Sequence, residues 1–112
     1  MGKTFAIPTA DGVLCPHFGH CQKFAIVKTD DQKVLSVEFI TPPGHQPGVY
    51  PGFLAQQGVN VVISGGMGMK AQDIFVQNNI EVCIGVGSDN PETLVEQYLS
   101  QMLKTGQNLC DH

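Results

Sequence analysis

The chain has 112 residues, 42% of them hydrophobic, which is the length of one domain and the composition of an ordinary globular protein. Its formal net charge is −4 and its six Lys and Arg residues form no cluster, so we expect no nucleic-acid partner. No apolar run approaches the roughly 20 residues of a membrane span, and the N-terminus shows no signal-peptide pattern. We therefore expect one cytoplasmic domain, residues 1–112, whose four cysteines are reduced ligands, redox thiols or core residues.

Short apolar runs separated by turn residues predict that the first half of the chain forms strands. These runs are residues 4–8, 24–29 and 34–40. Residues 13–22 are predicted to be an irregular loop, because Pro16 and Gly19 interrupt any period. The polar turn that joins the second and third runs is so short that these strands must be antiparallel. In the third run, alternation predicts Leu35, Val37 and Phe39 on one face.

Helical patterns and apolar strands alternate through the second half. Helices are expected at residues 49–57, 70–78 and 90–104, and strands at 59–63 and 80–86. The last helix has the clearest start, with Asn90 as N-cap and Pro91 at the first helical position, and an apolar stripe that reaches Met102. Because crossovers are right-handed, the later strands should be parallel. The order β-β-β-α-β-α-β-α predicts an α/β fold, a mixed sheet of about five strands with helices on both faces.

The most informative stretch joins a buried strand to a helix through glycines. Its residues are Gly65, Gly66, Met67 and Gly68, followed by Met69 and Lys70. Backbone N–H groups at such a turn can converge on one point, and a helix N-terminus adds partial positive charge, so the turn could hold an anion. The alternative is a turn that needs glycine only for its φ angles. The thioethers of Met67 and Met69 could bind a soft metal or simply pack.

A second stretch concentrates soft metal ligands. Two thiols and two imidazoles fall within seven residues: Cys15, His17, His20 and Cys21. Cys110 and His112 form a further pair, one residue apart. Thiolate and imidazole suit copper, zinc or iron–sulfur metal, although the spacing is not that of a zinc finger. The alternative is that these are small loop residues and exposed histidines. Cys83, inside an apolar strand, is predicted to be a core residue.

Ligands of open α/β sheets collect beyond the carboxyl ends of the parallel strands. The glycine turn and residues 87–89 should lie at this edge, as should the loop after Pro8 if the first strand is parallel to its neighbour. His45 is placed nearby if the sheet has the expected order. Catalytic patterns are poor: Cys15 has no obvious orienting carboxylate, and the glycine turn lacks the P-loop and dinucleotide spacings. We predict no catalytic residue.

Together these motifs resemble the family of small proteins that bind the nitrogenase iron–molybdenum cofactor or its precursors. Three segments carry the resemblance: residues 15–19 followed by Phe24, residues 58–68, and residues 110–112. The resemblance implies a three-layer α/β/α fold of ribonuclease-H-like type. It also implies non-catalytic binding of a metal–sulfur cluster that contains molybdenum with iron or copper. Many relatives carry Ser at the position of Cys15, so a thiolate there is no family requirement.

Three functions follow from these patterns. The leading hypothesis is a carrier that stores or delivers the cluster, with residues 65–69 as the anion cradle and the stretch from Cys15 to Cys21 as a ligand-bearing lid. His45, Cys110 and His112 are secondary candidates. The second hypothesis is an interaction module that regulates a P-loop ATPase or a cofactor-assembly protein. The third is a redox protein in which Cys15 and Cys21 cycle through a disulfide.

Overall fold

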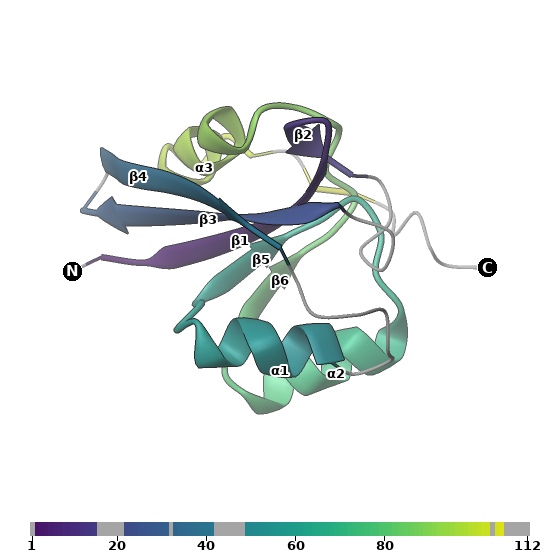
Figure 1. The fold of residues 1–112 in the computed structure, drawn as a ribbon. Helices are drawn as coiled ribbons and strands as arrows, with labels where there is room; N and C mark the ends of the chain where they lie inside the picture. Colours follow the sequence, from purple (N-terminus) through teal and green to yellow (C-terminus); the bar gives the residue numbers. More distant parts are fainter. Residues whose placement is uncertain (1, 16–21, 32, 42–48, 104, 107–112) are drawn as a thin grey trace.

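One mixed sheet forms the centre of the computed structural model of the protein. The structure describes residues 2–15, 22–31, 33–41, 49–103, 105 and 106, and for residues 49 and 50 it describes the backbone alone. In chain order the elements are β1 (Thr4–Ala10), β2 (Val13–Leu14), β3 (Lys23–Asp30), β4 (Lys33–Ile40), α1 (Val49–Gln56), β5 (Val61–Ile63), α2 (Met69–Gln77), β6 (Glu81–Cys83) and α3 (Pro91–Leu99). The chain is therefore an α/β protein with helices on both faces of the sheet (Figure 1).

The sheet has an antiparallel half and a parallel half. The strand order is β4-β3-β1-β5-β6, with β2 paired to β1 outside this path. β1 pairs antiparallel with β3. β3 in turn pairs antiparallel with β4, as the short turn at residues 30–33 predicts. β1, β5 and β6 pair parallel, as expected for strands joined by helical crossovers. Because β1 is parallel to β5, the ends of β1, β5 and β6 share one edge of the sheet.

The prediction that residues 13–22 are all irregular is wrong at their start. Val13 and Leu14 form β2, which pairs with Ala10 and Thr9 of β1, so the sheet has a sixth, two-residue strand. The reversal is made by Asp11 and Gly12, both with positive φ, at 55° and 84°. An Asp-Gly pair in this conformation is typical of a two-residue hairpin turn. Residues 16–21 of the predicted loop lie outside the described residues.

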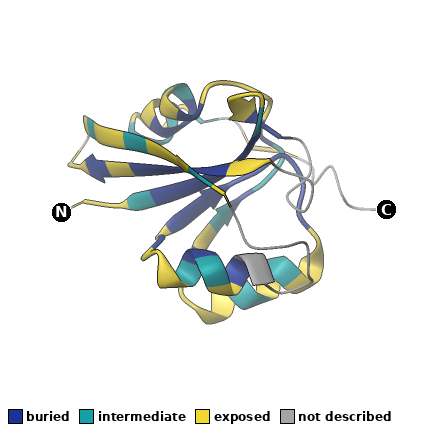
Figure 2. Cartoon of the chain, viewed as in Figure 1, coloured by how far each residue is buried: buried dark blue, intermediate teal, exposed yellow. Residues whose placement is uncertain are grey.

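Two hydrophobic cores separate the sheet from its helices. The lower core packs Leu54 of α1 and Phe75 of α2 against Ala6, Ile26 and Val62 of the sheet. The upper core packs α3 against the other face. Its members include Leu94, Val95, Phe5, Ile7, Val27 and Ile63. The central strands are buried on both faces, as their unbroken apolar sequences predict (Figure 2).

The edge strand β4 does not follow the predicted alternation. Lys28 pairs with Ser36 and Thr29 pairs with Val34, so Leu35 is an extra, unpaired residue at a β-bulge. The bulge shifts the inward positions: Val34 and Val37 pack on the upper core, whereas Leu35 is 64% exposed. The prediction that Leu35 lies on the same face as Val37 is therefore wrong.

The last helix is shorter than predicted. α3 begins as expected, with Asn90 as N-cap and Pro91 in the first turn, but it ends at Leu99. Gln101 adopts a positive φ of 61°, which ends the helix, and Met102 is 71% exposed instead of lying on the apolar stripe. Beyond it the backbone N–H of Gly106 donates to the carbonyl of Ile84 at 3.1 Å. No helix among the described residues has the length and apolarity to span a membrane.

Candidate functional site

Three chain segments meet at the carboxyl edge of the parallel strands. The N–H of Cys15 donates to the carbonyl of Pro8 at 2.8 Å, which continues the antiparallel pairing of β1 and β2 by one residue. Leu14 is held from the third segment, because its N–H donates to the carbonyl of Asp89 at 3.0 Å and its carbonyl accepts from the Ser88 hydroxyl at 2.9 Å. The edge location that was predicted for residues 87–89 is therefore confirmed.

The glycine turn follows β5 at the same edge and is fixed to the end of β6. The N–H of Ser64 donates to the carbonyl of Cys83 at 2.8 Å, and the N–H of Val86 donates back to the carbonyl of Ser64 at 3.3 Å. The N–H of Gly85 donates to the carbonyl of Gly65 at 2.9 Å. These bonds continue the β5–β6 ladder past the strands, so the turn starts from a rigid base.

Four successive carbonyl groups of the turn each accept an internal hydrogen bond. The carbonyl of Gly65 accepts from Gly85, and that of Gly66 accepts from the Ser64 hydroxyl at 3.0 Å. The carbonyl of Met67 accepts from the Gln72 amide at 2.9 Å, and that of Gly68 accepts from the Gln72 backbone N–H at 3.2 Å. These carbonyl oxygens, the negative ends of their peptide dipoles, are therefore engaged by donors of the chain itself.

The N-terminus of α2 adds positive potential to this turn. Its N-cap is Gly68, no side chain caps it, and its first turn contains no acid. The N-terminus of α3 differs on all three counts, because the Asn90 side chain accepts from the N–H of Glu92 at 2.9 Å and Glu92 is an acid in the first turn. The partial positive charge at the start of α2 is therefore not offset as it is in α3.

The glycines of the turn are not explained by their φ angles. Glycines with positive φ in the described part of the chain are Gly12, Gly58 and Gly85, and none of these belongs to the turn. Gly68 has φ −65° and ψ 154°, which any residue can adopt. A Cβ added at Gly68 would meet no described atom within 4 Å. The exposed backbone at Gly68 is therefore open to a bound molecule.

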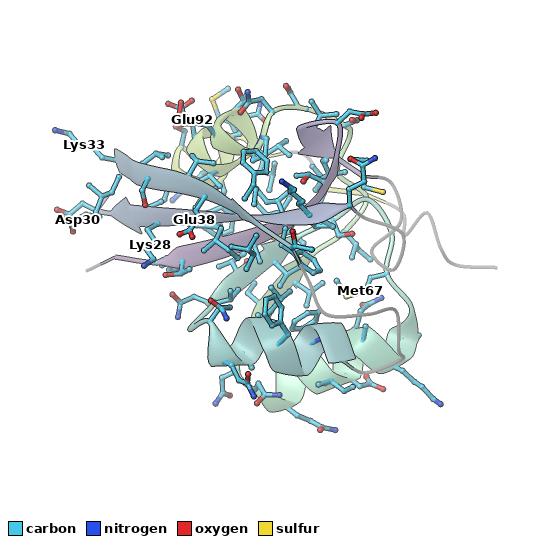
Figure 3. The ribbon with its side chains drawn as sticks, in the orientation of Figure 1. Lys28, Asp30, Lys33, Glu38, Met67 and Glu92 are labelled. Carbon is cyan, nitrogen blue, oxygen red and sulfur yellow. The ribbon has the colours of Figure 1, made fainter. Side chains whose placement is uncertain are left out.

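Cys15 and Met67 are brought into one cluster, while Met69 is not. Met67 is completely buried and Cys15 is 7% exposed, and both belong to the lower core. Met67 lies between the sheet and the layer of α1 and α2 (Figure 3). Any contribution of Met67 to an anion site would come from its backbone amide, since its thioether is packed inside. Met69 is 66% exposed on the first turn of α2.

The remaining predicted ligands fall outside the described residues. They are His17, His20, Cys21, His45, Cys110 and His112. Within the described part of the chain, no group of three or more His, Cys, Asp or Glu side chains could hold a metal ion. The structure therefore describes the glycine turn and, of the predicted lid, only Cys15.

A cluster of ionisable side chains at the opposite end of the sheet was missed by the sequence analysis. Tyr98 donates its hydroxyl to Glu81 Oε1 at 2.8 Å, and the Cys83 thiol lies 3.7 Å from Glu81 Oε2. Burial, then the charge of Glu81 and the bond to it, raise the pKa of Cys83 to about 11. Burial and the bond to Glu81 raise the pKa of Tyr98 to about 12. Alternation puts Glu81 and Cys83 on one face, but no sequence signal pairs them with Tyr98.

The fold is that of a small α/β protein with a glycine turn at the carboxyl edge of its parallel strands. Residues 1–101 match the model of the dinitrogenase iron–molybdenum cofactor family. The chain belongs to this family, as its motifs suggested.

The chain is also similar to individual proteins. An uncharacterized protein of Methanocaldococcus jannaschii, MJ0580, is 35% identical over 82 residues, which cover 69% of this chain and 70% of that protein. The crystal structure of PH0822 is similar with a TM-score of 0.84 and 27% identity, covering 91% of this chain and 93% of that one. The apo form of the orange protein from Desulfovibrio gigas has a TM-score of 0.77 at 20% identity, covering 95% and 94% of the two chains. The likeness to the orange protein concerns the fold alone.

Proposed function

We propose that the protein binds a polyanionic metal–sulfur cluster at the glycine turn and stores or delivers it without chemical conversion. The observation that carries the proposal is the set of four carbonyls, from Gly65 to Gly68, that accept internal hydrogen bonds beside an uncapped helix N-terminus. An acidic protein with a net charge of −4 can attract a polyanion only through local positive potential of this kind. The family name supports a cluster that contains molybdenum and iron, and a molybdenum–copper cluster is the alternative.

The proposed cradle consists of backbone groups from Gly65 to Met69. The proposed lid begins at Cys15, and the burial of Cys15 in the same lower core as Met67 supports a lid that starts near the cradle. His17, His20 and Cys21 would continue the lid, and His45, Cys110 and His112 are the secondary ligands of the proposal. Thiolates and imidazoles would then bind the metals directly, while amides bind the sulfide surface.

Gly68 allows a test in which binding and stability change in opposite directions. Gly68→Asp adds the capping side chain that α2 lacks and puts a negative charge where the anion would sit. We expect the variant to unfold at the same or a higher temperature, because an Asp cap stabilises a helix by a few tenths of a kcal/mol over Gly. Its affinity for tetrathiomolybdate, measured by equilibrium dialysis of the metal-free protein with and without copper(I), should fall at least tenfold.

Gly68→Asn is the matched control, since it has the same shape and capping ability without the charge. It should bind at least tenfold more tightly than Gly68→Asp. Equal binding by the two variants, or a wild-type protein that forms no coloured stoichiometric complex under anaerobic conditions, would refute the proposal. Loss of folding cannot imitate the expected result, because the Asp variant is expected to be at least as stable.

Several finer features belong to the same proposal. We infer a ribonuclease-H-like fold from the three layers and the mixed sheet, a cytoplasmic location, and a role without catalysis. A steady-state assay for reduction of the bound cluster or for ATP hydrolysis should therefore give no turnover. Sustained turnover by the purified protein would overturn the last of these inferences.

An interaction module is the second candidate, and one observation favours it. Met69 and Val76 are 66% and 65% exposed on α2, and their spacing of seven residues puts them on one stripe beside the cradle. Such a stripe could contact the proposed P-loop ATPase or cofactor-assembly protein. If this is the main function, a Met69→Ser, Val76→Ser variant should lose partner binding while tetrathiomolybdate affinity is kept.

A further inference from the structure

A cavity of about 530 Å³ lies beside β6 and the end of α3, and its charged lining residues belong to the end of the sheet opposite to the glycine turn. Lys3 precedes β1, Glu81 begins β6 and Asp31 follows β3, so all three belong to that end. The charged side chains Lys28, Asp30 and Lys33 of the β3–β4 hairpin also lie there, far across the sheet from Met67 (Figure 3). The volume is within the range of small-molecule sites in proteins.

Glu81 is the central acceptor of the cavity wall. Its two carboxylate oxygens accept from the Tyr98 hydroxyl at 2.8 Å and from the Cys83 thiol at 3.7 Å. Both donors have raised pKa values, about 12 for Tyr98 and about 11 for Cys83, and so remain protonated at neutral pH. Each carboxylate oxygen keeps a second lone pair, so the fixed Glu81 can accept a further donor from a molecule in the cavity.

The protein already holds one ammonium group against this wall. Lys3 Nζ lies 5.5 Å from the centre of the Tyr98 ring and 3.5 Å from its hydroxyl oxygen. The ring is held by Phe5, in an edge-to-face contact with centroids 5.0 Å apart. The Lys3 side chain is exposed, whereas its backbone is fixed to Thr29 by hydrogen bonds at 2.9 and 3.0 Å. Lys3 therefore acts as a tethered cation that a freely diffusing cation could displace.

We propose that this cavity binds a small organic cation, a primary amine with an apolar body. Among the described residues of the lining, two carboxylates, Glu81 and Asp31, and one ammonium, Lys3, give a formal charge of −1, which favours a cationic ligand over an anionic one. The Tyr98 face and the Glu81 carboxylate take the ammonium group. Leu99 and Leu103 line the cavity and take the apolar body.

Amide chemical shifts of the metal-free protein test the proposal with three probes of similar shape. We expect 2-phenylethylamine to shift the amides of Glu81, Cys83 and Gln101 saturably at neutral pH. 2-Phenylethanol should bind at least tenfold more weakly, and 3-phenylpropionate should leave these amides unshifted. Equal affinity for the amine and the carboxylate would overturn the proposal. So would the absence of a shift with the amine at about 10 mM, which is on the order of ten times the weakest typical enzyme KM, about 1 mM.

Two variants give responses of opposite sign. Glu81→Gln should weaken amine binding at least tenfold, while Glu92→Gln, an exposed acid in the first turn of α3, should leave it unchanged. Lys3→Met removes the tethered competitor and should strengthen amine binding at least threefold. A site built for anions would instead lose affinity when Lys3 is removed, so weaker amine binding by Lys3→Met also contradicts the proposal.

Discussion

Cys83 illustrates at the scale of single residues how neighbours set the chemistry of a side chain. It is 8% exposed and belongs to the upper core, as its apolar strand predicts. Its sulfur nevertheless lies against the Glu81 carboxylate, and burial together with that charge raises the thiol pKa to about 11. A thiol with such a pKa is a weak nucleophile and a poor metal ligand at neutral pH. Cys83 is therefore no candidate for the redox function considered from the sequence.

The raised pKa values make the protein less stable in alkali. The folded state holds the protons of Cys83 and Tyr98 more tightly than the unfolded state, where the pKa values are 9.0 and 10.0. The stabilisation that these two groups give the folded state is therefore complete below pH 9. It is lost as the pH rises to about 11 for Cys83 and to about 12 for Tyr98. We expect the free energy of unfolding, measured in urea, to fall between about pH 8.5 and about pH 10.5. These limits lie about half a unit below the lower and above the higher of the two unfolded-state pKa values.

Glu81→Gln should make this fall smaller, because it removes the charge but leaves the burial that is the first cause of both shifts. Glu92→Gln removes an exposed acid elsewhere on the surface and should show the wild-type pH dependence. The same slope in wild type and Glu81→Gln would show that Glu81 does not control these two groups.

At the scale of elements, α3 shows which parts of a helix are encoded locally. Asn90, Pro91 and Glu92 form a start signal within three residues, and the helix begins there. Its end was predicted too late, at residue 104. The observed end lies at Leu99, and Gln101, two residues later, has a positive φ of 61°, which is unusual for glutamine. The return of the chain toward Ile84, a contact made only in the folded protein, accounts for this early end.

Removing the N-cap should destabilise the protein measurably. Asn90→Ala deletes the side-chain oxygen that accepts from the N–H of Glu92 at 2.9 Å, and such losses typically cost about 1 kcal/mol. Thermal unfolding should show a lower midpoint. Asn78→Ala is the control, since that exposed amide only donates to a helix carbonyl, of Ile74, and should cost less than half as much. Equal losses in the two variants would show that Asn90 is not an effective cap.

The edge strand β4 marks a limit of reading strands from alternation. The sequence correctly predicts a strand from about residue 34 to 40, but not the bulge that turns Leu35 outward. A bulge depends on register with β3 across the hairpin, and one residue of slip exchanges the two faces of a strand. It also twists an exposed edge away from regular pairing, which protects a sheet from association with other chains.

At the scale of the whole molecule, the sequence predicts the architecture better than it predicts the sites. The unbroken apolar sequence of a strand such as Val61–Ile63 predicts that it is buried on both faces. Right-handed crossover connections through helices then make such strands parallel. The glycine turn was found because its residues are contiguous. The cavity at Glu81 was not, because Lys3, Glu81 and Tyr98 come from three distant segments and meet only after the sheet and α3 have assembled.

The two proposed sites lie at opposite ends of the parallel strands, and this arrangement predicts that they act independently. β6 covers Glu81–Cys83, so about 7 Å of strand separates Glu81 from Cys83, whose carbonyl accepts from the N–H of Ser64, and Gly68 lies a further four residues along the turn. Effects of substitutions that far apart normally add within about 0.5 kcal/mol. We therefore expect Gly68→Asp and Glu81→Gln to be additive in urea unfolding, and Gly68→Asp to leave the affinity for 2-phenylethylamine unchanged.

A coupling free energy above about 1 kcal/mol between these substitutions would contradict independence. It would mean that strain passes along β6 through Cys83. The carbonyl of Cys83 accepts from the N–H of Ser64 at 2.8 Å, and its sulfur contacts the Glu81 carboxylate. Cys83→Ala distinguishes the two cases, because it removes the sulfur contact but keeps the backbone bond. If coupling exists and disappears in this variant, the thiol transmits it; if it persists, the backbone ladder does.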